Sequence, residues 1–309
     1  MSSTTAVQVR AWRPAWPCDP YDILRSIRRG AADPAFRRDA DGTIWRAAQT
    51  PEGAATLRIR PRPRTGEVEL AGWGSGAEWM LEQAPTMMGA ADDVNNFAAS
   101  SGPVRAAWRT NPHWRVAQTG LVLEALVAAV IEQKVTGQEA WLGWRRLLTR
   151  YGVAAPGPPA IRGMRCLPAP SELVRIPSWE WLRCSIDGAR SATIVRAAAA
   201  AAALERTVGL PMHDVEQRLC SLPGVGIWTA AEVRQRAHGD ADAVSFGDYH
   251  VSRHVGWALT GEEITDSELE SLLRPDRPHR YRIQHIVTTR LPGRPRHGPR
   301  MAPRRHLPR

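Results

Sequence analysis

The stretch Leu222-Pro-Gly-Val-Gly-Ile-Trp-Thr-Ala230 decides the fold of this chain. On either side of it, segments 214–221 and 229–238 have the spacing of apolar residues that is typical of helices. Two glycines around one apolar residue allow a tight turn with positive φ, and Thr229 begins the second run of helix formers. Such a hairpin presents backbone N–H groups at a helix N-terminus, which favours binding of an anion such as a DNA phosphate. Taken alone, the pattern also fits an ordinary helix end.

A second signal lies downstream, in Ala243-Val-Ser-Phe-Gly-Asp-Tyr-His-Val251. This segment places Asp248 after an apolar stretch and just before the next predicted helix, 251–259. A helix N-terminus stabilises a carboxylate in its ionised form. By itself, Asp248 would therefore be interpreted as an ordinary N-cap residue.

Composition excludes several classes of protein. A chain of 309 residues that is 43% hydrophobic is not disordered as a whole and can form two modest domains or one large one. No apolar run approaches the roughly 20 residues that a membrane span needs, and no secretion signal is evident. The four cysteines have no C-x-x-C spacing, so we expect no metal site and no disulfide framework. We expect a cytoplasmic protein without membrane contact or cofactor.

The net charge of +10 is concentrated at one end of the chain. Segment 290–309 contains seven Arg and no acidic residue, which leaves about +3 for the rest. We expect this segment to be a disordered basic tail that either adds non-specific DNA affinity or only aids solubility. Lys134 is the single lysine of the sequence, and its amine, unlike a guanidinium, can lose its proton.

Two structural regions precede this tail. Residues 1–72 are predicted to form a small α+β domain, with a short helix from Asp19-Pro20 to 29. Its strands are expected at 7–12, 43–48, 55–60 and 67–71. Residues 73–289 have helical periodicity. Helices are predicted at 77–88, 92–99, 122–133, 138–151, 171–174, 178–186, 189–207, 214–221, 229–238, 251–259 and 266–273.

The chain resembles the helix-hairpin-helix DNA glycosylases, specifically the 3-methyladenine DNA glycosylase II type. The resemblance is carried by 222–230, Gly239-Asp-Ala-Asp242, Gly247-Asp-Tyr249 and the helix Glu124-Ala-Leu-Val-Ala-Ala-Val-Ile-Glu-Gln-Lys-Val-Thr136, and it covers about 76–287. It implies a mainly α fold, with helical glycosylase domains preceded by a small α+β domain with an antiparallel sheet. The implied partner is double-stranded DNA, bound by a monomer in the cytoplasm at the nucleoid.

The resemblance also assigns the chemistry. Asp248 falls where the family keeps its catalytic aspartate, whose carboxylate stabilises positive charge on the sugar as the N-glycosidic bond breaks. Family members that also nick the strand have a lysine where this chain has Trp228. An indole cannot form a Schiff base but can stack on an electron-poor flipped base. The implied activity is monofunctional excision of alkylated purines.

Residues around the hairpin are implied in DNA binding. Gly224, Val225, Gly226 and Thr229 would contact phosphate, and relatives can hold a monovalent cation on the hairpin carbonyls. Gln133 and Lys134 fall where the family inserts a residue into the stack left by the flipped base. Lysine is a departure there. It could act as the wedge, bind a phosphate, form a Schiff base, or be a solvated charge at a helix end.

Two further departures concern the base pocket. Glu232 and His279 stand where alkylation-repair members can present aromatic residues, and Tyr249 beside Asp248 is another candidate for lining the pocket. Tyr249 also has a purely structural interpretation. Hydrogen-bonding groups in place of aromatics leave open a glycosylase for a deaminated or oxidised purine. A non-catalytic DNA-binding protein is a third alternative, against which the position of Asp248 argues.

Overall fold

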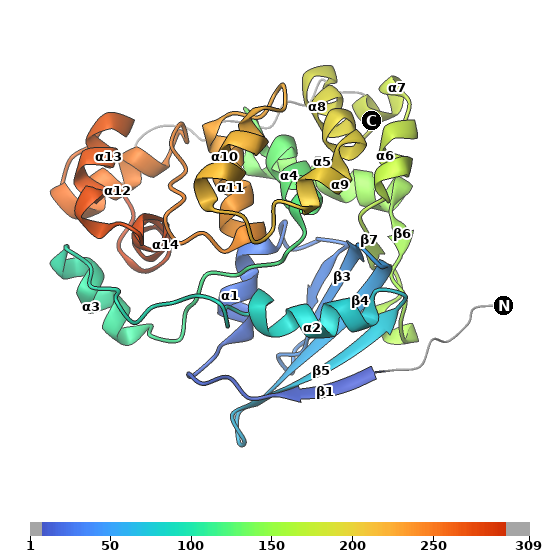
Figure 1. Cartoon of the computed structure of the whole chain (residues 1–309), viewed down its shortest axis with the longest axis horizontal. Helices are drawn as coiled ribbons and strands as arrows, with labels where there is room; N and C mark the ends of the chain where they lie inside the picture. Colours follow the sequence, from blue (N-terminus) through green and yellow to red (C-terminus); the bar gives the residue numbers. More distant parts are fainter. Residues whose placement is uncertain (1–7, 295–309) are drawn as a thin grey trace.

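The N-terminal part of the computed structural model, which describes residues 8–294, is a five-stranded antiparallel sheet (Figure 1). The strand order is β1-β5-β4-β3-β2. The strands are β1 (Gln8–Trp12), β2 (Phe36–Arg38), β3 (Ile44–Thr50), β4 (Gly53–Arg62) and β5 (Glu67–Gly74). Alternation in β4 buries Leu57 and Ile59, which lie opposite Gly72 and Leu70 of β5. Four of these strands match the predicted ones, and the three-residue β2 was not predicted.

Two helices accompany the sheet. Helix α1 (Pro20–Leu24) begins at Asp19, whose carboxylate accepts the backbone N–H groups of Tyr21 and Asp22. It ends earlier than expected, in a 3₁₀ turn over Arg25–Ile27. Helix α2 (Ala77–Met87) packs on the sheet and adds Met80 and Leu81 to its core, so this core extends past the expected boundary at residue 72.

A bundle of helices forms the largest core of the molecule. It contains α4 (Val122–Glu132), α5 (Gly137–Tyr151), α6 (Pro170–Arg175), α7 (Ser178–Arg183), α8 (Gly188–Ala199), α9 (Ala201–Glu205), α10 (Met212–Cys220) and α11 (Ile227–Val233). Helix α4 is apolar on nearly all sides because it lies at the centre and packs against α5, α8, α9 and α11. A two-stranded ribbon, β6 (Val153–Ala154) with β7 (Arg165–Cys166), follows α5. The single helix predicted over 189–207 is divided into α8 and α9 at Ala200.

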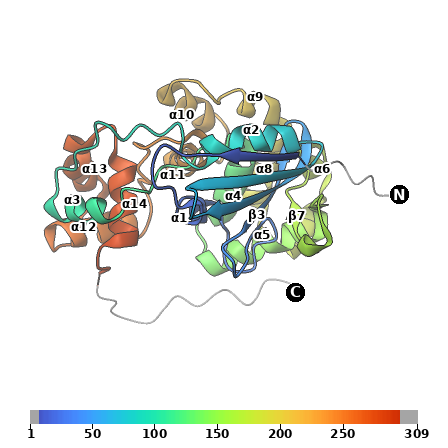
Figure 2. The ribbon, with the colours of Figure 1, turned by 90° about the horizontal axis from the view of Figure 1, so that it is seen from below.

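The remaining helices form a separate group, at the left of Figure 1 and again at one end of the molecule in Figure 2. They are α3 (Gly102–Thr110), α12 (Val251–Thr260), α13 (Asp266–Leu273) and α14 (Arg280–Arg290), with a common apolar core. The chain thus passes from the sheet to this group with α3 and then forms the bundle. It finally returns to the group with α12, α13 and α14. The helix predicted at 92–99 is wrong, because this segment forms turns. Helices α3 and α14 were not predicted.

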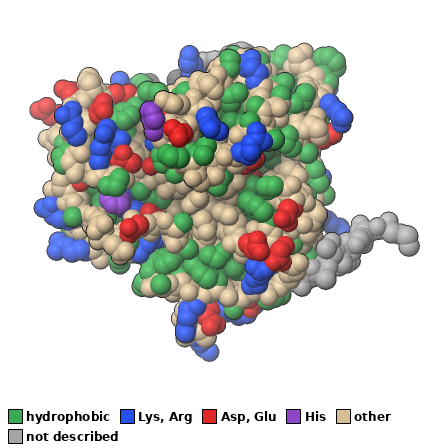
Figure 3. Space-filling view, viewed as in Figure 1, with side chains coloured by type: hydrophobic (Ala, Val, Ile, Leu, Met, Phe, Trp, Pro, Cys, Tyr) green, Lys and Arg blue, Asp and Glu red, His purple; other side chains and the backbone are tan. Residues whose placement is uncertain are grey.

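The prediction of a mainly α fold with a small antiparallel α+β part is confirmed. Within residues 8–294, the helices lack the combination of length and hydrophobicity needed to cross a bilayer. The same residues contain no group of three or more His, Cys, Asp or Glu that could hold a metal. On the face seen in Figure 3, basic and acidic side chains are interspersed. The predicted tail, 290–309, lies largely outside the described residues.

Candidate active site

The hairpin between α10 and α11 has the geometry that its two glycines predict. Gly224 has φ +95°, in the left-handed region, whereas Gly226 is extended at the N-terminus of α11. Val225 between them is buried in the bundle core, and its N–H donates to the carbonyl of Leu222 at 3.0 Å. A Cβ at Gly224 would lie 2.1 Å from Oγ1 of Thr193, so α8 packs directly against this turn.

Two side chains from other helices hold the hairpin carbonyls. Arg196 of α8 donates from Nε and Nη2 to the oxygen of Pro223, at 3.2 and 3.0 Å. Gln133, just after α4, donates from Nε2 to the oxygen of Gly224 at 3.0 Å and to Oγ1 of Thr229 at 2.8 Å. The structure therefore places the Gln133 side chain directly against the hairpin, and its predicted contact with DNA stays a prediction. Arg196 was not predicted, because nothing in the sequence signals a contact 27 residues away.

Lys134 follows Gln133 in the short connection between α4 and α5. Its side chain is exposed, and its backbone has φ +54°, in the left-handed region that non-glycine residues rarely adopt. The next helix is fixed independently by a capping box, in which Thr136 and Glu139 satisfy each other's backbone N–H groups. Lys134 thus stands out from the surface next to the hairpin.

Asp248 lies just before α12, and Trp228 of α11 contacts it. Oδ1 of Asp248 accepts the backbone N–H groups of His250 at 2.7 Å and Val251 at 3.1 Å. Oδ2 accepts the indole N–H of Trp228 at 3.2 Å. Both side chains are half-buried. The carboxylate holds the turn just before α12, whose N-cap residue is His250, and it also contacts Trp228, which follows the hairpin.

Tyr249, next in sequence, points into solvent. Its side chain is 69% exposed, with the guanidinium of Arg253 at 4.1 Å from the ring centre and His250 edge-on at 4.9 Å. The structure therefore places Tyr249 on the surface beside Asp248 rather than in an enclosed pocket.

Glu232 is buried one turn after Trp228 and has two partners. Nη1 of Arg236 lies 2.6 Å from its Oε2, and the hydroxyl of Ser245 donates to its Oε1 at 2.7 Å. Arg236 belongs to a π-helical segment, Arg234–His238, that continues α11. Such segments occur frequently at functional sites. The spacing of Glu232 and Arg236 signals this ion pair, but Ser245 had no sequence signal.

His279 is buried at the N-terminus of α14, where its ring meets Phe97 edge-on at 5.3 Å. Burial and the nearby Arg282 guanidinium lower the pKa of its imidazole. The structure does not bring His279 into contact with Asp248. Tyr281, two residues further, is buried closer to the Glu232–Arg236 pair, and burial raises the pKa of its hydroxyl to about 12.

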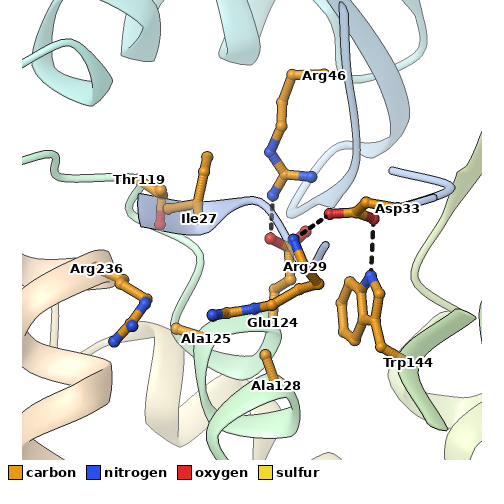
Figure 4. Close-up of a pocket in the computed structure, with 10 residues that line it drawn as sticks. All are labelled: Ile27, Arg29, Asp33, Arg46, Thr119, Glu124, Ala125, Ala128, Trp144 and Arg236. Atoms are coloured by element: carbon orange, nitrogen blue, oxygen red, sulfur yellow. Dashed lines mark hydrogen bonds and ion pairs between the residues drawn. The ribbon is translucent and has the colours of Figure 1, made fainter. Parts of the chain in front are cut away.

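A second group of charged residues joins the N-terminal sheet to α4 (Figure 4). Arg46 of β3 pairs with Glu124 of α4. Asp33 accepts the backbone N–H of Arg29 at 2.7 Å and the indole N–H of Trp144 at 2.9 Å. These residues surround a small buried cavity, which is also lined by Ile27, Thr119, Ala125, Ala128 and Arg236. They do not contact Asp248, and we interpret them as the connection between the two parts of the molecule.

Neither the known family models nor the curated proteins contain a match to this chain. Solved structures do. A 3-methyladenine DNA glycosylase from Archaeoglobus fulgidus is 16% identical, with a TM-score of 0.75 over 90% of this chain and 96% of the other. The 8-oxoguanine glycosylase/lyase of Clostridium acetobutylicum in its apo form is 11% identical, with a TM-score of 0.70 over 91% and 97%. The chain has the helix-hairpin-helix DNA glycosylase fold.

The Clostridium enzyme has also been solved with double-stranded DNA that contains cytosine opposite 8-oxoguanine. That complex matches with a TM-score of 0.69, 11% identity, and coverage of 92% of this chain and 96% of the other. Neighbours that act on two different lesions thus share this architecture. The likeness therefore does not distinguish one lesion from another.

Proposed function

We propose that this chain is a monofunctional DNA glycosylase that flips alkylated purines out of double-stranded DNA and hydrolyses their N-glycosidic bond. The observation that carries the proposal is the contact between Trp228 and Asp248 beside the hairpin, within this fold. A carboxylate and an indole meet where the hairpin would bring the DNA backbone.

The surroundings of Asp248 suit this reaction. When the bond between C1′ and the purine nitrogen breaks, its electrons leave with the base and positive charge develops on the sugar. The N–H groups of His250 and Val251 hold Oδ1 in a fixed position just before α12. Among residues 8–294, Oδ2 accepts one hydrogen bond, from Trp228, and it retains a lone pair for the sugar or for a water. The water adds its hydroxyl to C1′, and its remaining proton passes to the carboxylate or to solvent.

Trp228 supports hydrolysis without strand cleavage. A Schiff base with C1′ needs an amine, and the side chain at this position has none. Its indole instead offers a face to a cationic alkylpurine, a contact worth about 0.5–2 kcal/mol. Alkylation also makes the base a good leaving group, so the site needs no strong general acid.

The hairpin and Lys134 support DNA binding. Backbone N–H groups at the start of α11 are available to a phosphate, and Arg196 and Gln133 keep the turn in place. Lys134 projects from the same region, where it would enter the space left by the flipped base.

A second candidate substrate class has an observation in its favour. Glu232 and Arg236 form a buried ion pair one and two turns beyond Trp228. This pair presents hydrogen-bonding groups rather than aromatic faces, which suits a neutral deaminated or oxidised purine. A pocket built to form such bonds discriminates strongly against bases that lack them.

Base release from duplex DNA tests the proposal. We expect wild-type protein to release 3-methyladenine and 7-methylguanine, and to give strand breaks only after alkali. Asp248→Asn should lower the single-turnover rate by at least about 100-fold, by analogy with the loss of one charge-stabilising group. Asp41→Asn, the same change in a turn of the N-terminal sheet, is the control and should leave the rate unchanged.

The other outcomes separate the alternatives. Release of hypoxanthine or 8-oxoguanine, without release of methylated bases, would favour the second substrate class. Duplex binding without release of any base would favour a non-catalytic binding protein. Strand breaks before alkali, trapped by borohydride, would contradict the monofunctional assignment and implicate Lys134.

A further inference from the structure

Ser245 occupies an unusual position in the loop that carries Asp248. It is 1% exposed and lies three residues before Asp248. Its hydroxyl donates to Oε1 of Glu232 at 2.7 Å. It accepts from Nε2 of Gln235 at 2.8 Å and from Nε2 of Gln284 at 3.0 Å. A serine hydroxyl has one donor and two acceptor positions, and all three are filled.

The backbone of the same loop is held by the same side chains. Oε1 of Gln284 accepts the N–H of Ser245 at 3.0 Å, and Nε2 of Gln235 donates to the carbonyl of Ala243 at 2.6 Å. The carbonyl of Ser245 in turn accepts the backbone N–H of Asp248 at 3.2 Å. Ser245 therefore connects the turn before α12 to both α14 and the π-helical end of α11.

The chain of contacts also reaches the N-terminal part of the protein. Arg236 pairs with Glu232 and donates from Nε to the carbonyl of Ser26 at 3.2 Å. The extra residue of the π-helical segment widens this turn of the helix. Gln235 reaches Ser245 from this segment, and Glu232 reaches it from α11 just before. Arg236 points instead to the turn after α1.

We infer that Ser245 is a positioning residue for Asp248: its hydroxyl, bonded to Glu232, Gln235 and Gln284, fixes the turn that aims the carboxylate. This inference rests on the proposed function in one respect, since the aim of Asp248 matters only if Asp248 meets a substrate. Reacting groups must be held within a fraction of an ångström, and a displacement of about 1 Å can cost on the order of 100-fold in rate. The buried bonds of Ser245 supply such a constraint.

Ser245→Ala tests the inference by single-turnover excision, with duplex affinity measured in parallel. We expect the excision rate to fall by about 10- to 100-fold, while the Kd for undamaged duplex changes less than about twofold. Ser191→Ala, on α8, is the matched control, because that hydroxyl is also buried but bonds only locally, to the carbonyl of Gly188. In an Asp248→Asn background, Ser245→Ala should cause no further loss. An equal loss in that background, or a wild-type rate for Ser245→Ala itself, would overturn the inference.

Hydrogen exchange provides a second readout that does not depend on activity. We expect Ser245→Ala to accelerate exchange of the amides of Asp248, His250 and Val251 on the order of tenfold, and Ser191→Ala to leave them unchanged. Unchanged protection in Ser245→Ala would overturn the positioning role even if no lesion is excised. Absence of excision by wild-type protein would instead count against the proposed function alone.

Discussion

Lys134 combines an exposed amine with a backbone conformation that is unfavourable for its residue type. The left-handed region costs a non-glycine residue roughly 1–2 kcal/mol, and Lys134 at φ +54° occupies it between two well-formed helices. Strained residues of this kind concentrate at functional sites. Substitutions at this position can separate the effect of the backbone strain from the effect of the side-chain amine.

We predict that Lys134→Gly and Lys134→Ala lose DNA affinity and excision rate to the same extent, because both lack the amine. Their stabilities should differ, with the glycine variant more stable by about 1 kcal/mol in urea unfolding, since glycine adopts positive φ without strain. Lys134→Arg retains a positive charge and serves as the control for phosphate binding. An excision rate equal to that of wild type in the alanine variant would show that Lys134 is not part of the DNA interface.

At the scale of elements, the hairpin depends on two glycines that face different environments. Gly224 has positive φ and lies against Thr193, whereas a Cβ at Gly226 would meet nothing within 4 Å. Replacing each glycine by alanine therefore compares the same substitution at a position that is sterically constrained and at one that is not.

We predict that Gly224→Ala lowers the free energy of unfolding by about 1–3 kcal/mol through backbone strain and the clash with Thr193. Gly226→Ala should change it by less than about 0.5 kcal/mol. Urea denaturation of the two variants measures the difference. Duplex affinity should also fall in Gly224→Ala, because its hairpin amides are displaced. Equal stabilities would mean that the turn adapts and that α8 does not constrain it.

Local chemistry explains which elements could be predicted from the sequence. The hairpin, the capped helices and the longer strands follow from glycine positions, N-caps and periodicity within a few residues. The segment 92–99 does not form its predicted helix, because Asp92 is used by distant residues. Its carboxylate accepts the N–H of Val116 at 2.8 Å and pairs with Arg282 at 2.6 Å. Periodicity carries no information about such contacts.

The candidate site likewise contains residues that the sequence indicated and residues that it did not. Residue type and family resemblance pointed to Asp248 and Trp228, and the structure brings them together, although their roles stay predictions. Ser245 and Arg196 escaped notice because their partners come from other segments, namely from helices for Ser245 and from the hairpin for Arg196. Glu232 was expected in a base pocket, and no sequence pattern indicates that one of its oxygens accepts a hydrogen bond from Ser245.

At the scale of the whole molecule, the centre is a junction where the N-terminal part meets both helical groups. Ile23 of α1, Trp114 and Val116 pack there with Tyr281 of α14. His285, one turn further along α14, stacks on Trp114 with ring centres 3.8 Å apart and an interplanar angle of 14°. Within the described residues, 8–294, the buried Nε2 atom of His285 has no hydrogen-bond partner.

Burial in this junction, together with the positive charges of Arg25 and Arg290, lowers the pKa of His285 to about 3. An unfolded chain binds the proton near pH 6.5. Between these two pH values the unfolded state binds more protons than the folded state. The contribution of neutral His285 to the free energy of unfolding is therefore fully present above about pH 6.5 and is lost as the pH decreases. Acidification should therefore weaken the junction that joins the parts of the protein.

We predict that His285→Phe, which keeps a ring stacked on Trp114 but cannot titrate, reduces this acid sensitivity. Relative to the variant, wild-type protein should lose about 1.4 kcal/mol of unfolding free energy per pH unit below pH 6.5, or about 2 kcal/mol at pH 5. Urea unfolding of both proteins at pH 7, 6 and 5 measures the difference. His213→Phe, on the exposed face of α10, is the control, because that ring is exposed to solvent in the folded protein as well as in the unfolded chain. If wild type and His285→Phe lose stability in parallel on acidification, His285 is not held neutral in the folded protein, and the acid sensitivity of the junction must come from its carboxylates.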